Sequence, residues 1–139
     1  MMNRYTYDEI SVGMTESFSA TVTEEMMKSF LAITGDVNPL HNDEEFAKSK
    51  GHPSRVVYGM LTSSFLSTLA GVYLPGERSL IHSMETRLMK PVYIGDTLTV
   101  TGKVIEKSES VPVMIISVNI KKQSGEMVLR GKMQIGVTD

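Results

Sequence analysis

The sequence contains no cysteine and no tryptophan. Without cysteine, disulfide bonds, thiolate catalysis and cysteine-ligated metal sites are all excluded. No apolar run reaches the roughly 18 residues that would suggest a membrane span, and the N-terminus lacks the basic-then-apolar layout of a signal peptide. We therefore expect a cytoplasmic protein that does not act in a membrane.

The chain also lacks a strong excess of charge of either sign, since its formal net charge at pH 7 is −2. A balanced charge argues against broad electrostatic binding of nucleic acid. The length of 139 residues and the hydrophobic content of 41% are typical of one soluble globular unit. We expect residues 1–139 to form a single domain that buries a core without a disulfide or a structural metal.

The first half of the chain predicts a strand and then helices. Residues 15–22 have the pattern of a strand, and Thr23 resembles a helix N-cap. Residues 24–33 place apolar side chains at near-helical spacing, and Gly35 is expected to end that helix. Asn42 or Asp43 can cap a short helix that follows.

The second half predicts one buried helix and an antiparallel sheet. Residues 59–73 are too apolar for a surface helix and too few to span a bilayer, which favours a helix wrapped by the rest of the domain. Apolar and polar residues then alternate with period two, as in strands with one buried face. Strands with this alternation are expected at residues 97–104, 114–120 and 127–137, with a hairpin turn at 123–125, and residues 78–89 are a further strand candidate. The fold class is therefore α+β.

The loop between the first helices carries the most reactive side chains. Asp36 and His41 lie on either side of a turn that contains Asn38 and Pro39. A neutral imidazole beside a carboxylate is a suitable general acid and base near neutral pH. Aspartate and asparagine also bond to the backbone of their own turns, so the spacing alone leaves a catalytic and a purely structural interpretation open.

Residues 30–41, FLAITGDVNPLH, followed by Ala47, resemble the hydratase 2 motif of R-specific enoyl-CoA hydratases and MaoC-like dehydratases. Residues 58–61 (YGML) and 90–98 (KPVYIGDTL) are similar to later segments of the same family. The resemblance implies a hot-dog fold, in which an antiparallel β-sheet wraps around a central α-helix. It also implies a homodimer with active sites at the subunit interface.

The activity implied by the resemblance is reversible hydration of a trans-2-enoyl thioester to the (R)-3-hydroxyacyl thioester. The substrate would be an acyl-CoA or an acyl-carrier-protein thioester. No metal and no separate cofactor is expected, because CoA is part of the substrate.

Carried over residue by residue, Asp36 and His41 would be the catalytic dyad that activates water and delivers a proton. Asn38 and Pro39 would shape the loop. The backbone N–H of Gly59 would bind the thioester oxygen, as an unpaired N–H at a helix start can. Ser67 matches a family serine near the dyad, although a small residue for helix packing explains it as well.

One position departs from the family pattern. Tyr58 stands where the family commonly has histidine. A tyrosine can donate a hydrogen bond but cannot act as an imidazole. The departure therefore affects the surroundings of the oxyanion site and leaves the dyad untouched.

Other polar residues carry weaker expectations. His52 and His82 are interpreted as surface or supporting residues, since the three histidines lack the helical spacing of a metal site. Several basic side chains are candidates for the phosphates of the carrier arm: Arg78, Arg87, Lys90, Lys103, Lys121 and Lys122.

Two other functions remain open at this stage. A hot-dog thioesterase would aim water at the thioester carbonyl, and the spacing from Asp36 to His41 disfavours it. A non-catalytic module that binds acyl thioesters would use the same loop only for structure.

Overall fold

The computed structural model describes residues 1–139 as one antiparallel sheet around a helix. The order of the strands is β1-β3-β4-β5-β2, and every neighbouring pair is antiparallel. Their bounds are Thr15–Thr21 for β1, Ser79–Leu88 for β2, Thr97–Lys107 for β3, Val113–Lys122 for β4 and Met127–Val137 for β5. Every expected strand is confirmed.

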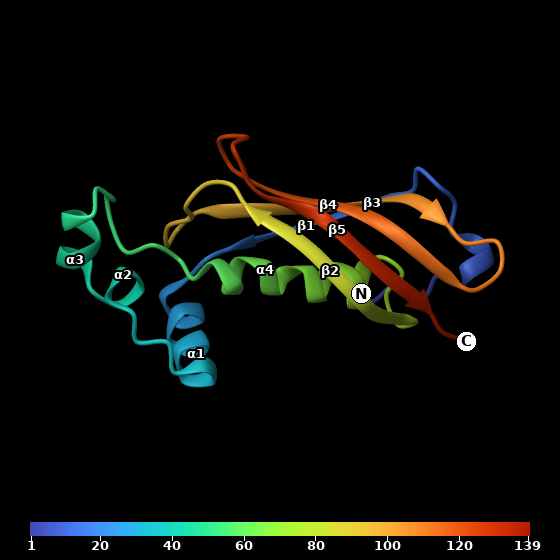
Figure 1. The fold of residues 1–139 in the computed structure, drawn as a ribbon, viewed down its shortest axis with the longest axis horizontal. Helices are drawn as coiled ribbons and strands as arrows, with labels where there is room; N and C mark the ends of the chain where they lie inside the picture. Colours follow the sequence, from blue (N-terminus) through green and yellow to red (C-terminus); the bar gives the residue numbers. More distant parts are fainter.

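A central helix lies against the curved sheet (Figure 1). It consists of α4, Gly59–Thr68, which continues into a wider π-helical turn, η2, at Leu69–Tyr73. The expected helix at residues 59–73 is therefore confirmed, with a change of helical type in its last five residues. The sheet wrapped around α4 is the hot-dog arrangement that the family resemblance implied.

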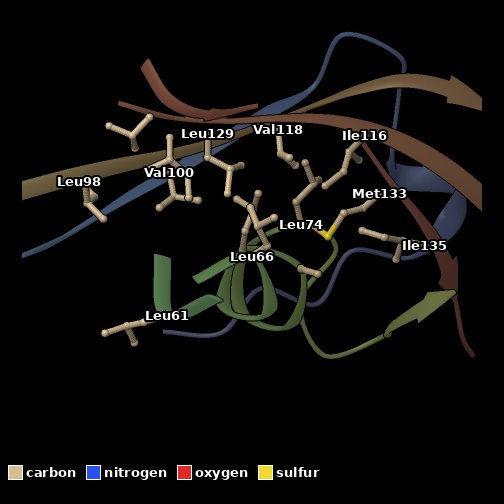
Figure 2. Packing of buried hydrophobic residues seen from close by; sticks show 14 of the residues in the cluster. Leu61, Leu66, Leu74, Leu98, Val100, Ile116, Val118, Leu129, Met133 and Ile135 are labelled. Carbon is tan, nitrogen blue, oxygen red and sulfur yellow. The ribbon is translucent and has the colours of Figure 1, made fainter. Parts of the chain in front are cut away.

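The core forms where α4 meets the inner face of the sheet. In β3 and β4 alternate residues are buried, and Leu98, Val100, Ile116 and Val118 point toward the helix (Figure 2). Leu66 on α4 is fully buried among them. Burial of large apolar side chains on both layers, at roughly 1.5–3 kcal/mol each, holds the helix under the sheet.

Three further helices lie together beyond the N-terminal end of α4 (Figure 1). They are α1, Glu24–Thr34, α2, Pro39–Asn42, and α3, Glu44–Ser49; a short 3-10 turn, η1, lies at Tyr7–Glu9. Thr23 caps α1 by accepting a hydrogen bond from the N–H of Met26, and Gly35 ends it with a left-handed φ of 71°. Both expectations for this helix are confirmed.

The sequence did not reveal α2. Residues 35–42 were expected to form a turn, whereas Pro39–Asn42 make one helical turn inside that loop. Asn38 caps the turn, because its side chain accepts a hydrogen bond from the N–H of Leu40, and Asp43 caps α3 in the same way through Phe46. No helix of the protein is long and apolar enough to cross a membrane.

Candidate active site

The loop between α1 and α3 is held in shape by its own polar side chains. Asp36 Oδ1 accepts a hydrogen bond from the N–H of Asn38 at 3.1 Å. Asn42 Nδ2 donates to the carbonyl oxygens of Asp36 and Asn38 at 3.2 and 3.0 Å. Pro39 is the first residue of α2, where its missing N–H costs nothing. The turn roles considered for Asp36 and Asn38 are thus present, yet Asp36 keeps its second carboxylate oxygen free and is exposed.

His41 has a defined tautomer. Its Nδ1 lies 2.7 Å from the carbonyl oxygen of Val56. A carbonyl can only accept a hydrogen bond, so Nδ1 must carry the hydrogen. In the neutral ring Nε2 then has a free lone pair, which can accept a proton.

Tyr58 connects the loop to the hydrophobic core. Only 2% of Tyr58 is exposed, and its ring lies 4.3 Å from the ring of His41 and 4.6 Å from that of Phe30, measured between centroids. Its hydroxyl donates a hydrogen bond to the carbonyl oxygen of Asp36 at 2.9 Å and lies 3.2 Å from Asn42 Nδ2. One side chain therefore contacts both candidate catalytic residues.

Gly59 begins α4 directly after Tyr58. As the first helical residue it has no hydrogen-bond acceptor for its N–H within the helix. A Cβ at this position would lie 2.5 Å from Leu88 Cδ1, so a larger residue would displace the side chain that covers it. The N–H is thus available to a ligand that approaches the backbone closely.

A cavity of about 310 Å³ joins His41 and Gly59. Most of its wall is apolar, and it is bounded by the end of β2, the segment after it, and the first turn of α4. Its lining residues are His41, Val56, Val57, Gly59, Thr62, Leu88, Met89, Lys90, Pro91, Val92 and Val128. An apolar pocket with a few polar groups suits a small organic ligand.

The structure does not bring every expected residue to this cavity. Asp36 and Ser67 are exposed and do not line it, and neither do Asn38, Pro39 and Tyr58. Of the basic candidates only Lys90 does. His52 Nδ1 lies 2.9 Å from the Tyr93 hydroxyl, and His82 is exposed beside Gln134, which matches the supporting or surface roles expected for both histidines.

Two contributors were missed in the sequence. Thr62 is a buried polar residue on the cavity wall, and Asn42 ties the loop together. A threonine inside a mostly apolar helix was the available signal for the first. Asn42 was considered only as a helix cap.

The turn that follows the cavity wall is fixed by Asp96. Burial raises the pKa of Asp96, but hydrogen bonds from the Gln123 side chain and the Tyr93 N–H, together with the charge of Lys122, outweigh burial and hold it below its ordinary value. No group of three or more His, Asp or Glu side chains lies close enough to hold a metal ion.

Comparison with known proteins gives a family match over most of the chain. A family model described as MaoC like domain matches residues 9–126. The (R)-specific enoyl-CoA hydratase of Rhodospirillum rubrum is 33% identical over 105 residues, which are 73% of this chain and 73% of that protein. The (R)-specific enoyl-CoA hydratase of Aeromonas caviae is 30% identical over 123 residues, which are 88% of this chain and 92% of that protein.

Solved structures agree with the fold. The R-hydratase PhaJ1 of Pseudomonas aeruginosa, in its unliganded form, superposes with a TM-score of 0.91 at 28% identity. The match covers 96% of this chain and 86% of that one. The hot-dog arrangement is therefore shared with an R-hydratase over nearly the whole chain.

Proposed function

We propose that this chain, which belongs to the MaoC-like dehydratase family and is an enzyme of the hydratase and dehydratase class, catalyses the reversible hydration of a trans-2-enoyl-CoA. The product of hydration is the (R)-3-hydroxyacyl-CoA. The observation that carries the proposal is the free Nε2 of His41 at a cavity shared with the Gly59 N–H.

Proton transfer is assigned to Asp36 and His41. In hydration the dyad removes one proton from water as its oxygen bonds to C3 of the enoyl group, and C2 receives a proton from the dyad. The hydrogen bond to Val56 leaves His41 Nε2 able to accept, and Asp36 has a carboxylate oxygen without a protein partner. General acid and base catalysis of this kind typically contributes about 10²–10⁴ in rate.

The backbone N–H of Gly59 stabilises negative charge in the proposed reaction. As water adds to C3, negative charge builds on the thioester oxygen. An unpaired N–H at the positive end of α4 stabilises that charge and needs no reorganisation during the reaction. Leu88, which packs over Gly59, limits the space next to the N–H.

Lys90 is the basic side chain best placed for the carrier arm. It is exposed, and it lies at the wall of the cavity that contains His41 and Gly59. A lysine ammonium binds phosphate as a point charge. We assign it to the phosphates of CoA.

The working unit is proposed to be a homodimer formed along β2. β2 has a free edge and exposes Leu80, Ile81, Met84 and Leu88. The other edge strand, β1, exposes polar residues: Thr15, Ser17, Ser19 and Thr21. An exposed apolar edge strand favours pairing with another chain, and a second copy beside Leu88 would close the open side of the site.

The experiment that tests the function follows the absorbance of crotonyl-CoA, with chiral analysis of the product and a parallel assay for free thiol. Absorbance loss without thiol release, and an (R)-3-hydroxy product, would support the proposal. Thiol release would favour a thioesterase instead. Binding without either signal, across short and medium enoyl chains on CoA and on acyl carrier protein, would favour a non-catalytic module.

A further inference from the structure

Thr62 is a buried hydroxyl without a hydrogen-bond partner. It lies one turn into α4 and is 2% exposed. Its Oγ1 has no partner among the protein's polar groups, and it is the one buried side-chain oxygen or nitrogen in that condition. Buried polar groups in native proteins are nearly always paired, so an exception calls for an explanation.

The neighbouring hydroxyls make the contrast clear. Ser63 Oγ donates to the carbonyl oxygen of Gly59 at 3.0 Å, and Ser64 Oγ donates to that of Leu61 at 2.6 Å. Helical serine and threonine commonly bond to a preceding carbonyl in this way. Thr62 makes no such bond, so its hydroxyl hydrogen remains available to another acceptor.

Thr62 lies beside the cavity that contains His41. Thr62 and Gly59 both line that cavity. Residues three apart share one face of a helix, and helical side chains lean toward the N-terminus, over the preceding turn. The Thr62 side chain therefore covers the turn on which the free N–H of Gly59 is presented.

We propose that the Thr62 hydroxyl donates a second hydrogen bond to the thioester oxygen, beside the bond from the Gly59 N–H. This inference rests on the proposed hydration reaction. When the water oxygen bonds to C3, the C2=C3 electron pair shifts to form an enolate, and its charge lies largely on the thioester oxygen. Thr62 keeps its proton throughout and stabilises that charge, which then returns to C2 as C2 is protonated.

The direct test compares Thr62→Val with Thr62→Ser in the crotonyl-CoA assay. Valine keeps the shape and removes the hydroxyl, so we expect kcat to fall about 10²-fold while KM stays within about twofold. Serine restores a donor and should recover most of kcat. Thr68→Val is the matched control, since it makes the same change at the other end of α4, away from the cavity, and should leave kcat unchanged.

A stability measurement separates this role from a structural one. Because valine removes an unpaired buried hydroxyl, Thr62→Val should melt at or above the temperature of the wild type. A variant that melts no lower and keeps the wild-type kcat would overturn the proposal. If the wild type itself hydrates no enoyl thioester, the proposed function fails, which is a distinct result.

A spectroscopic readout does not depend on turnover. In an inactive Asp36→Asn background, a bound 2,4-dienoyl-CoA should absorb at longer wavelength when its carbonyl is polarised by hydrogen bonds. Adding Thr62→Val should reduce that shift, and Thr62→Ser should preserve it. An equal shift with and without the hydroxyl would also contradict the proposal.

Discussion

Tyr58 makes three contacts that hold the candidate site together. Its hydroxyl donates to the carbonyl oxygen of Asp36, and its ring packs against the rings of His41 and of Phe30 in α1. A buried ring loses little freedom when it makes such contacts, because the core already fixes it. Tyr58 therefore holds both members of the proposed dyad in contact with the core.

Removing only the Tyr58 hydroxyl should release the Asp36 end of the loop while His41 keeps its packing. We expect Tyr58→Phe to lower kcat about 10-fold, since small misplacement of a catalytic group is costly, and to change KM less than about twofold. Steady-state kinetics with crotonyl-CoA measures both values.

Tyr7→Phe is the matched control for that variant. The Tyr7 hydroxyl also donates to backbone carbonyls, those of Ser108 and Val113, but it lies far from the cavity in η1. It should lose stability and keep kcat. A Tyr58→Phe protein as active as the wild type would show that the ring alone holds the loop.

Single residues differ in how far the sequence reveals them. Asp36, Asn38 and His41 could be named as candidates, because reactive residue types stand around one turn and the segment resembles a family motif. The tautomer of His41 could not, since it depends on the carbonyl of Val56, 15 positions away. Thr62 was missed because burial of its hydroxyl is a property of the packed domain.

Elements of the fold were predicted where local rules dominate. The cap at Thr23, the stop at Gly35 and the alternation in β3, β4 and β5 all depend on near neighbours. The helical turn α2 was not predicted, because a single turn is too short to show a helical periodicity in the sequence. The π-helical end of the central helix likewise depends on packing under the sheet.

The turn at Asp96 lies next to the wall of the cavity and is fixed by several hydrogen bonds. The N–H of Gly95 and the carbonyl of Asp96 bond to Val22 at the end of β1, and the Asp96 carboxylate holds Tyr93 and Gln123. The segment from Lys90 to Val92, which lines the cavity, is therefore followed by a turn that is bonded to Val22 and to Gln123.

The depressed pKa of Asp96 gives this turn a defined pH dependence. A carboxyl whose pKa is lower in the folded than in the unfolded protein stabilises the fold at pH values above its ordinary pKa, 3.8 for aspartate. This contribution is lost as the pH falls through the lower pKa of the folded state. Asp96→Asn should melt about 2–5 °C below the wild type at pH 7. In thermal melts, the difference in melting temperature between Asp96→Asn and the wild type should narrow below about pH 4.

Asp8→Asn serves as the control for that experiment, because Asp8 is exposed and makes no side-chain hydrogen bond. It should melt like the wild type at both pH values. A difference in melting temperature between Asp96→Asn and the wild type that stays constant from pH 7 to pH 3 would contradict the proposed dependence on Asp96 ionisation.

The whole molecule has two unlike sheet edges, and only β2 exposes a set of large apolar side chains. A charge in the middle of an edge strand opposes pairing with another chain. Met84→Lys should therefore shift the protein from dimer to monomer in light scattering and lower activity with it. Val111→Lys, an equally exposed change in a loop, should leave both unchanged.

The proposed dimer shows what the sequence does not reveal at the scale of the whole molecule. The sequence of β2 predicts a strand but does not show that this strand has a neighbour on one side only. Only the strand order shows that β2 ends the sheet and that the candidate site opens beside it. A Met84→Lys protein that remains a dimer would place the contact elsewhere.

The most direct test of the account is hydration of saturating crotonyl-CoA by Asp36→Asn and His41→Ala, each verified as folded and able to bind the thioester. If these two residues transfer the protons, kcat should fall at least about 10³-fold in both variants while thioester binding persists. Either variant retaining kcat within tenfold of the wild type would contradict the assignment of proton transfer to Asp36 and His41.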